Sequence, residues 1–208
     1  QFKIVEIHKF LPKKIIGNLK LGFDPSLFTK RAFNLNFNKS QKLIPIKKNL
    51  VDEIYKNKES KRKKFYSLPG MVVGESYKSK ISKVISKLKK GGGDYQFITA
   101  SENNAWLLNI RGSDSKYTPI PYSYILIDKK KNINFFCDLK KIPASFKKNF
   151  NKIKFINIKN TNLILSQIFK KNIIIDKDTC SIYYESIILK NNKIFKQQDP
   201  VYALKAIK

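Results

Sequence analysis

The sequence predicts an α/β fold in which a mixed, partly parallel sheet is flanked by helices. Segments typical of strands alternate along the chain with segments that have the apolar period of a helix, which is the order expected of this class. Hydrophobic residues make up 42% of the 208 residues and aromatic residues 12%, so the chain can form a packed core and is not globally disordered. Two β-rich runs near the middle, 120–127 and 132–137, predict a hairpin that is the one antiparallel part of the sheet.

The first part of the chain predicts a small α/β unit. Strands are expected at 2–8, 21–23 and 42–46. Asp24 is suited to cap a helix that has Pro25 as its first residue. The apolar face of this helix is then expected to consist of Leu27, Phe28 and Ala32.

A second helix is expected to start at 50–54 and to give way to a basic run at 56–64. This run holds six Lys and Arg residues and few apolar ones, so we interpret it as a linker, with a domain boundary near 58–66. A nucleic-acid patch would need interleaved aromatic residues, and only Phe65 and Tyr66 border the run.

The second block opens with the clearest helix, predicted at 76–90. Its apolar residues fall at i, i+4, i+7, i+8 and i+11, which is one face of a 3.6-residue period: Tyr77, Ile81, Val84, Ile85 and Leu88. The lysines are expected mainly on the rest of its surface: Lys78, Lys80, Lys83, Lys87 and Lys90. The three glycines at 91–93 follow a helix and not a strand, so they predict a helix end and not a phosphate-binding loop.

The remaining elements alternate to the end of the chain. Further strands are expected at 95–98, 152–158, 172–175 and 193–195. Helices are expected at 101–108 with Ser101 as N-cap, at 145–150, 162–171 and 179–189, and again from 199–200 onward.

The formal net charge of +28 first suggests a nucleic-acid or anionic-surface binder. However, 40 of the 43 cationic residues are Lys, and the arginines are Arg31, Arg62 and Arg111. The 40 Lys, 29 Ile and 19 Asn residues together indicate an AT-rich codon bias. Because Arg is the preferred residue for bidentate phosphate and base contacts, specific nucleic-acid binding is not the expected function.

Several classes of site and of protein are excluded. With one histidine, His8, and two cysteines, Cys137 and Cys180, the chain lacks the four ligands of a structural zinc site. The cysteines are expected to be reduced and buried in a cytoplasmic protein. No apolar run approaches the ~20 residues that span a bilayer, so a membrane-spanning protein is excluded. Met71 is the only methionine, so we expect a fragment or a processed chain.

One motif carries a specific resemblance. The segment AWLLNIRGSD, from Ala105 to Asp114, is followed at short spacing by YTP at 117–119 and SY at 123–124. This motif resembles the Xaa-Pro aminopeptidase (aminopeptidase P) family, related to creatinase and prolidase. Shorter segments add to the resemblance: NLVD at 49–52, GES at 74–76, KI at 80–81, DP at 199–200 and LKAIK at 204–208. The family often has Trp where Tyr55 stands and Arg-Pro soon after, where this chain is rich in Lys.

The resemblance implies a domain plan. Residues 1–60 correspond to the C-terminal part of a first creatinase-like domain plus linker, 61–198 to a second creatinase N-terminal-like domain, and 199–208 to the start of a helix that leads to a "pita-bread" catalytic domain. In the family that domain binds two divalent metal ions, often manganese, through two Asp, one His and two Glu. This chain is therefore expected to hold no metal and no catalytic residue, and to hydrolyse nothing by itself.

The resemblance also implies partners: the catalytic domain, a proline-containing peptide substrate and a second copy in a homodimer. Within the motif, Asn109, Arg111 and Asp114 are the candidate substrate-facing or interdomain residues. Two interpretations stay open for them, a buried turn and a loop that faces the catalytic cleft and restricts it to short peptides.

Physical chemistry adds detail to the motif. Trp106 is expected to pack, Asn109 to hydrogen-bond the backbone at the end of its helix, and Gly112 to adopt a positive φ. Arg111 is expected to pair with Asp114 or a neighbouring carboxylate through its planar fork.

Other carboxylates and other functions are less favoured. The adjacent Asp52 and Glu53 are expected at a helix N-terminus, and Asp176 or Asp178 as an N-cap. The rival function is a stand-alone interaction module with no enzyme attached. A reading frame that continues beyond Lys208 into Asp, His and Glu metal ligands would favour the aminopeptidase.

Overall fold

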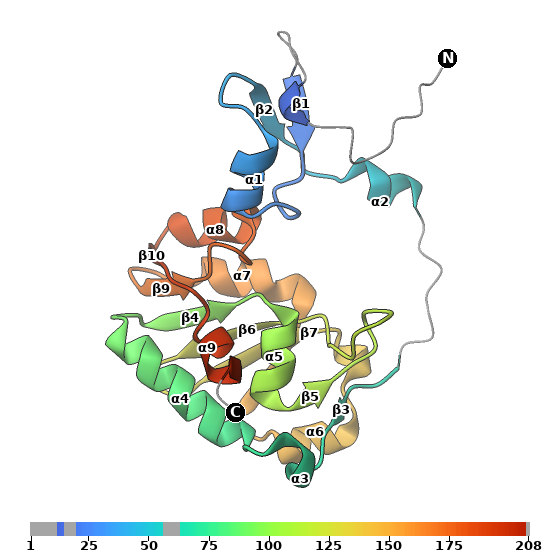
Figure 1. Ribbon diagram of the computed structural model, residues 1–208, viewed down its shortest axis with the longest axis vertical. Coiled ribbons are helices and arrows are strands. Elements are labelled where there is room, and N and C mark those ends of the chain that lie inside the picture. Colours follow the sequence, from blue (N-terminus) through green and yellow to red (C-terminus); the bar gives the residue numbers. More distant parts are fainter. Residues whose placement is uncertain (1–11, 15–19, 56–62, 207–208) are drawn as a thin grey trace.

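The computed structural model describes residues 12–14, 20–55 and 63–206. Within these residues, six strands form a central mixed sheet (Figure 1). In spatial order they are β10 (Lys193–Lys196), β9 (Asn172–Ile175), β4 (Tyr95–Ile98), β6 (Tyr124–Asp128), β7 (Ile133–Cys137) and β8 (Ile153–Asn157). Strand β6 is antiparallel to both of its neighbours, and the other pairs are parallel. The predicted α/β fold with a mixed sheet is confirmed, and so is the β6–β7 hairpin, although the β4–β6 pair is antiparallel as well.

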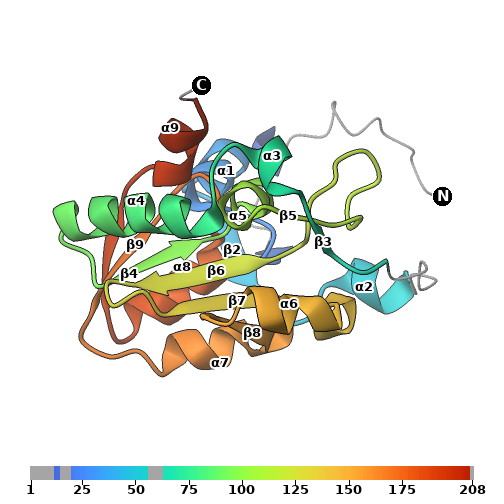
Figure 2. The same cartoon turned by 90° about the horizontal axis from the view of Figure 1, so that it is seen from below.

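Helices cover both faces of this sheet (Figure 2). On one face lie α4 (Tyr77–Lys90), α5 (Ser101–Leu108) and α9 (Pro200–Ala206), and on the other α7 (Thr161–Ser166) and α8 (Ile182–Leu189). Successive residues of a strand point to opposite faces, so Ile98 packs with α4 and α5 while Phe97 packs with α7 and α8. The apolar pattern of the sequence thus supplies two cores, one on each side of the sheet.

Helix α4 agrees with its predicted bounds. Ser76 caps it by accepting a hydrogen bond from the Ser79 N–H, and Gly91 ends it. The predicted apolar face is buried, but Lys80, expected on the surface, is only 2% exposed and lies among the buried residues.

A smaller unit lies beside α8 (Figure 1). It consists of the parallel strands β1 (Lys20–Phe23) and β2 (Lys42–Pro45), with α1 (Lys30–Asn36) and a cluster of phenylalanine rings. It contacts α8 through backbone hydrogen bonds, such as that from the Ile182 N–H to the Phe28 carbonyl at 2.8 Å. The predicted strand at 2–8 and most of the basic linker lie outside the described residues.

The predicted start of α1 is wrong. Asp24 accepts a hydrogen bond from the Ser26 N–H and closes a turn, and the helix begins at Lys30 with Thr29 as N-cap. As a consequence Leu27, expected on an apolar helix face, is 68% exposed. A side chain that can cap a helix can equally stabilise a turn, and local sequence does not separate the two outcomes.

Three further boundaries differ from the predictions. Helix α7 ends at Ser166 and not near 171, and α8 begins after Ser181, so neither Asp176 nor Asp178 is its N-cap. Ser101 is not the N-cap of α5, because the cap residue is Ala100 and the Ser101 hydroxyl bonds to the Ser123 carbonyl.

The remaining elements are short. They are α2 (Leu50–Ile54), α3 (Gly70–Val73), α6 (Ala144–Asn149), the paired strands β3 (Tyr66–Ser67) and β5 (Ile110–Arg111), and the 3-10 helices at Pro12–Lys14, Leu139–Lys141 and Ile158–Asn160. Asp52 and Glu53 lie in the first turn of α2, as predicted. None of the helices in the described ranges is long and apolar enough to cross a bilayer.

Both cysteines are free and buried, as the sequence predicts. Burial raises the pKa of the Cys137 and Cys180 thiols to about 12. Because the thiolate is the reactive form, we expect dithionitrobenzoate to label both residues slowly in the native protein and rapidly in urea. Fast labelling of the folded chain would contradict this burial.

Candidate functional site

The AWLLNIRGSD segment runs from the end of α5 through β5 into the loop that precedes β6 (Figure 1). Helix α5 ends at Asn109, whose φ of 57° places it in the left-handed region. Its backbone N–H donates to the Ala105 and Trp106 carbonyls. Asn tolerates this conformation better than other residues with a side chain, so it both stops the helix and redirects the chain.

Lys80 of α4 is buried beneath this helix end. Its Nζ donates to Asn109 Oδ1 at 2.6 Å and to the Trp106 carbonyl at 2.9 Å, and it lies 4.0 Å from the centroid of the Trp106 ring. Burial lowers the pKa of Lys80, while the charge of Glu75 acts in the opposite direction. The ammonium is thus held by an amide, a carbonyl and an aromatic face.

Asn109 uses the other half of its amide to reach the start of α4. Its Nδ2 donates to the Glu75 carbonyl at 2.9 Å. The expectation that the Asn109 side chain bonds the freed backbone at the end of its own helix is wrong, because the carbonyl that it reaches precedes α4. One side chain joins the beginning of one helix to the end of another.

The predicted carboxylate partner of Arg111 is wrong. Its Nη1 donates to the Ala105 and Ile110 carbonyls, both at 3.1 Å. A cation that bonds the last carbonyls of a helix also interacts favourably with the helix dipole. Arg111 therefore completes the end of α5.

Asp114, the other expected partner, bonds elsewhere. Its Oδ2 accepts a hydrogen bond from the Tyr122 N–H at 2.7 Å, and its Oδ1 forms an ion pair with Lys141. These bonds fix the base of the loop that connects β5 to β6.

Gly112 is required for a reason other than the one expected. Its φ is not positive, since Asn109 supplies that conformation. A Cβ at Gly112 would instead lie 2.9 Å from the Pro121 Cα and 3.0 Å from the Pro121 N. The two ends of the 112–121 loop approach so closely that only glycine fits.

The tip of this loop is open to solvent. Tyr117 is 86% exposed and lines a hollow of about 520 Å³ together with Lys63, Ser115 and Lys116. The structure thus brings Asn109, Arg111 and Asp114 into one supporting framework, with each side chain bonded inward. What reaches solvent is the 115–119 tip.

Sequence reasoning missed Lys80 as part of this framework. A signal was present, because Tyr77, Lys80, Ile81 and Val84 follow the i, i+3, i+4, i+7 pattern of one helix face. A lysine at a core position of an amphipathic helix indicates a buried ammonium that needs acceptors.

A second polar cluster lies where α9 begins. Asp199 is buried and accepts hydrogen bonds from Asn103 Nδ2 at 2.6 Å and from the Val201 N–H at 2.9 Å, while its own N–H donates to Asp176 Oδ2. Burial raises the pKa of Asp199 from 3.8 to about 6. The Oδ1 of Asn103 is buried and has no hydrogen-bond partner among the described residues.

We expect Asp199→Asn to change how stability depends on pH. A carboxyl with a raised folded-state pKa contributes most below its unfolded pKa, and this contribution is lost as the pH rises through the folded value. The free energy of unfolding of Asp199→Asn, relative to that of wild type, should therefore increase by on the order of 2–3 kcal/mol between about pH 4 and pH 8. The new amide can also donate to Asn103 Oδ1. Urea unfolding of both proteins across this range measures the difference, and parallel curves would contradict it.

No group of three or more His, Cys, Asp and Glu residues that could hold a metal ion occurs in the described part of the chain.

Comparison with known proteins identifies the family. Residues 56–208 match the model of the creatinase/prolidase N-terminal domain. The chain belongs to this family. The match covers the central sheet, its helices and the AWLLNIRGSD segment, which agrees with the resemblance noted from the motif.

Two proteins similar to this creatinase/prolidase N-terminal domain are named as Xaa-Pro aminopeptidases. The chain is 33% identical over 132 residues to a probable Xaa-Pro aminopeptidase P of Coprinopsis cinerea, covering 61% of this chain and 21% of that protein. It is 28% identical over 215 residues to the Xaa-Pro aminopeptidase ApepP of Drosophila melanogaster, covering 97% of this chain and 35% of that protein. The chain thus spans about a third or less of the length of these relatives.

A solved structure shares the fold of the whole chain. The X-prolyl aminopeptidase of Caenorhabditis elegans, described as a cytosolic enzyme with a di-nuclear active site, superposes with a TM-score of 0.78 at 23% identity. The superposition covers 100% of this chain and 36% of that one. The chain is thus an N-terminal domain of the kind found in Xaa-Pro aminopeptidase-like proteins.

Proposed function

We propose that the chain is the non-catalytic N-terminal region of a metal-dependent Xaa-Pro aminopeptidase, an enzyme that releases the residue before a penultimate proline. In this proposal residues 1–60 form the end of a first creatinase-like domain plus linker, 61–198 a second such domain, and 199–208 the start of the helix that leads to the catalytic domain. The family match and the aminopeptidase names of the relatives support this assignment.

The 112–121 loop, which is fixed at its base and exposed at its tip, carries the proposal. Its base is closed by the contact of Gly112 with Pro121 and by the bonds of Asp114 to the Tyr122 N–H and Lys141. Its tip, around Tyr117, makes few contacts. A loop that is fixed at its base is suited to narrow the entrance of a neighbouring cleft. Because the base is already ordered, the loop loses little further conformational entropy when a substrate binds. Asn109, Arg111 and Asp114 act as positioning residues for it.

Kinetics on the complete gene product test this role. Replacing 115–119 by a Gly-Ser linker is expected to raise kcat/KM for long proline-containing peptides several-fold relative to short ones, since the entrance is wider. A matched replacement in the exposed β6–β7 turn at 129–131 should leave the ratio unchanged. Equal effects of the tip replacement on peptides of all lengths would refute the gating role. A reading frame without a metallopeptidase domain would instead favour a stand-alone interaction module.

The metal belongs to the proposed catalytic domain. There, manganese or a related divalent ion would activate water for attack on the peptide bond. The 208-residue chain alone is expected to release no N-terminal residue from an Xaa-Pro peptide, with or without added manganese. The likeness to the Caenorhabditis elegans enzyme, which is cytosolic and di-nuclear, supports a parent enzyme of the same kind in the cytoplasm. Hydrolysis by the isolated chain would overturn this assignment.

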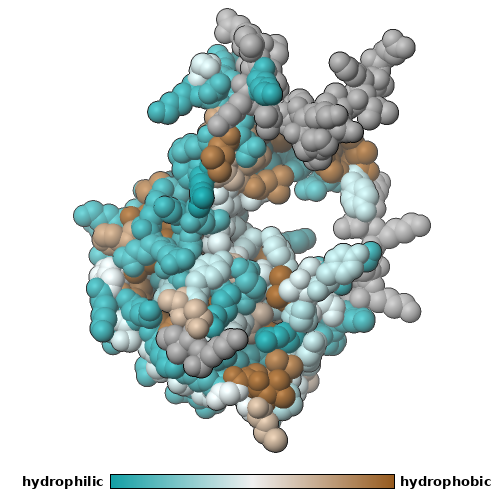
Figure 3. Space-filling view, in the orientation of Figure 1, coloured by the Kyte–Doolittle hydropathy of each residue, from teal (hydrophilic) through white to brown (hydrophobic). Residues whose placement is uncertain are grey.

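We include a contribution to dimerisation in the proposal. The apolar residues of α3 are exposed, with Met71 at 99%, and form a patch at the lower edge of the molecule in Figure 3. Patches of this kind mark interaction surfaces. Sedimentation of the complete protein should shift toward the monomer when Met71 and Val72 are changed to Lys. An unchanged dimer would place the interface elsewhere.

A further inference from the structure

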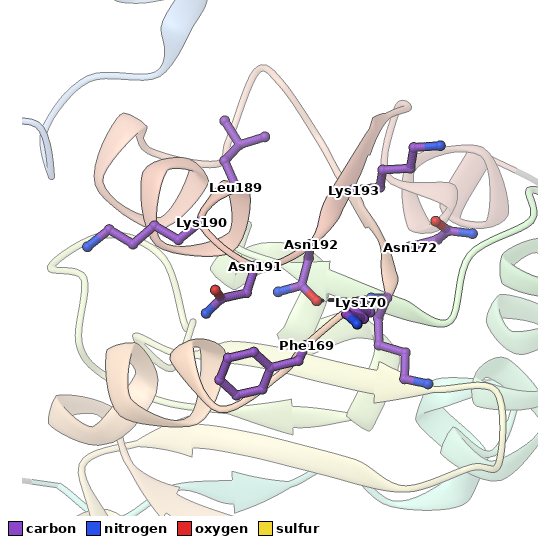
Figure 4. A pocket seen from close by; sticks show the side chains of 9 residues that line it. Phe169, Lys170, Asn172, Leu189, Lys190, Asn191, Asn192 and Lys193 are labelled. Carbon is purple, nitrogen blue, oxygen red and sulfur yellow. Dashed lines mark hydrogen bonds between the residues drawn. The ribbon is translucent and has the colours of Figure 1, made fainter.

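A groove of about 620 Å³ lies at the amino-terminal ends of β9 and β10 (Figure 4). Its walls are the turn that follows α7 and the turn that joins α8 to β10. Four lysines line it, together with two apolar residues: Lys170, Lys171, Lys190, Lys193, Phe169 and Leu189. This end of the sheet is remote in sequence from the AWLLNIRGSD segment and is not used by the proposed gating role.

The floor of the groove is held by hydrogen bonds between the two turns. Asn192 donates through Nδ2 to the Ile168 carbonyl at 2.7 Å and accepts through Oδ1 from the Lys171 N–H at 3.1 Å. The Lys170 N–H donates to the Asn191 carbonyl at 2.8 Å. The groove is thus formed before any partner binds, which reduces the entropy that binding must cost.

Lys170 is kept in an unfavourable conformation at the rim. Its φ is 52°, in the left-handed region that costs a residue with an ordinary side chain roughly 1–2 kcal/mol. Glycine or asparagine would adopt this turn more easily. Backbone strain of this kind is found preferentially at functional positions.

The lysines of the groove carry unbalanced charge. None of them forms an ion pair within the described residues. The charge of Lys171 contributes to lowering the pKa of the Asp94 carboxyl. That pKa is, however, lowered chiefly by hydrogen bonds from the Asn172 N–H and from Lys129. An occupant of the groove must therefore supply negative charge.

Apolar surface accompanies this charge. Phe169 is 58% exposed and Leu189 is 53% exposed, and Figure 4 shows them on opposite sides of the Asn191 and Asn192 side chains. Simple polyanions gain nothing from such side chains. A second copy that docked through the same groove is an unsuitable occupant, because it would place these four lysines opposite their counterparts. A single-stranded nucleic acid would favour several stacking aromatics, and the groove offers one.

We propose that this groove docks an acidic peptide segment in which an apolar side chain is flanked by carboxylates. The apolar side chain lies between Phe169 and Leu189, and the carboxylates reach the lysines on the two rims. The central Asn191, whose side chain makes no hydrogen bond to another described residue, is available to the peptide backbone. Such a partner is matched in both charge and apolar surface, which is the basis of specific docking.

Fluorescence anisotropy tests the proposal with the 208-residue chain and a labelled peptide rich in Asp and Glu around a central Leu-Phe pair. At about 0.1 M salt, where remote charges are screened, this peptide should bind at least ~10-fold more tightly than its Ser-Ser analogue. Phe169→Ser with Leu189→Ser should reduce that ratio to near one. Equal binding of the two peptides to wild type would overturn the proposal.

Charge-reversal pairs separate the groove from general lysine effects. Lys190→Glu with Lys193→Glu should weaken binding about tenfold or more. The control is Lys89→Glu with Lys154→Glu, which has the same net charge and also replaces one lysine at a helix end and one in a strand, both exposed. It should bind within about threefold of wild type. Equal losses in both pairs, or tighter binding of an oligonucleotide of matched charge, would refute a peptide groove. Circular dichroism confirms that each variant is folded.

Discussion

Asn109→Ala is expected to destabilise the domain by about 2–4 kcal/mol. The substitution removes one of the two acceptors of the buried Lys80 ammonium and leaves the Trp106 carbonyl, and a hydrogen bond to a charged group contributes roughly 1.5–3 kcal/mol. It also forces alanine into the left-handed conformation at the end of α5, at roughly 1–2 kcal/mol. Urea unfolding measures the loss, and the 112–121 loop should become more sensitive to proteolysis at the same time.

Two controls separate these causes. Asn109→Gly keeps the left-handed backbone without strain and removes the side-chain amide. It should therefore retain most of the loss of stability that is caused by removing this acceptor of the Lys80 ammonium. Lys80→Met combined with Asn109→Ala removes the ammonium together with this acceptor, and a double-mutant cycle should show a coupling of at least about 1 kcal/mol. If both single Asn109 variants stayed within about 0.5 kcal/mol of wild type, the ammonium would not depend on this amide.

Gly112→Ala is expected to cost about 1–3 kcal/mol and to displace the base of the gating loop. The added Cβ would meet the Cα, N and preceding carbonyl of Pro121 at 2.9–3.1 Å, and backbone atoms yield less readily than the end of a side chain. In the complete enzyme the same variant should alter the preference for peptide length, because the loop tip moves with its base.

Gly70→Ala is the matched control, since nothing lies within 4 Å of a Cβ at that position and its φ is not positive. Replacing glycine where the backbone is unstrained reduces the entropy of the unfolded chain and is expected to be neutral or stabilising by up to about 1 kcal/mol. Similar losses for both variants in thermal unfolding would mean that the contact with Pro121 is not the reason for Gly112.

The motif shows where prediction from residues succeeds and where it fails. The packing of Trp106 against the core follows from its large apolar side chain, whereas the partners of the Asn109 side chain, Lys80 and the Glu75 carbonyl, were not predicted. The expected Arg111–Asp114 pair was wrong because each side chain found a partner distant from the other: carbonyls at the end of α5 for Arg111, and Lys141 with the Tyr122 N–H for Asp114. Composition offered no means of ranking these partners.

What the sequence determined by itself was local and periodic. The bounds of α4 and its end at the glycines follow from side chains within a few residues of one another, and such relations hold in any tertiary context. The α/β class and the β6–β7 hairpin follow from the same periodicities.

Only the tertiary structure decided which of several suitable partners each polar group would take. Asp24 closes a turn, Lys80 bonds to an amide 29 positions away, and Gly112 meets a proline from the other end of its loop. These choices depend on which surfaces folding brings together and on the cost of burying a polar group without a partner. A short stretch of sequence shows neither which surfaces will meet nor which polar groups will be buried. The partners of Lys80, Asn109, Arg111 and Asp114, which position the 112–121 loop, were therefore visible only in the folded structure.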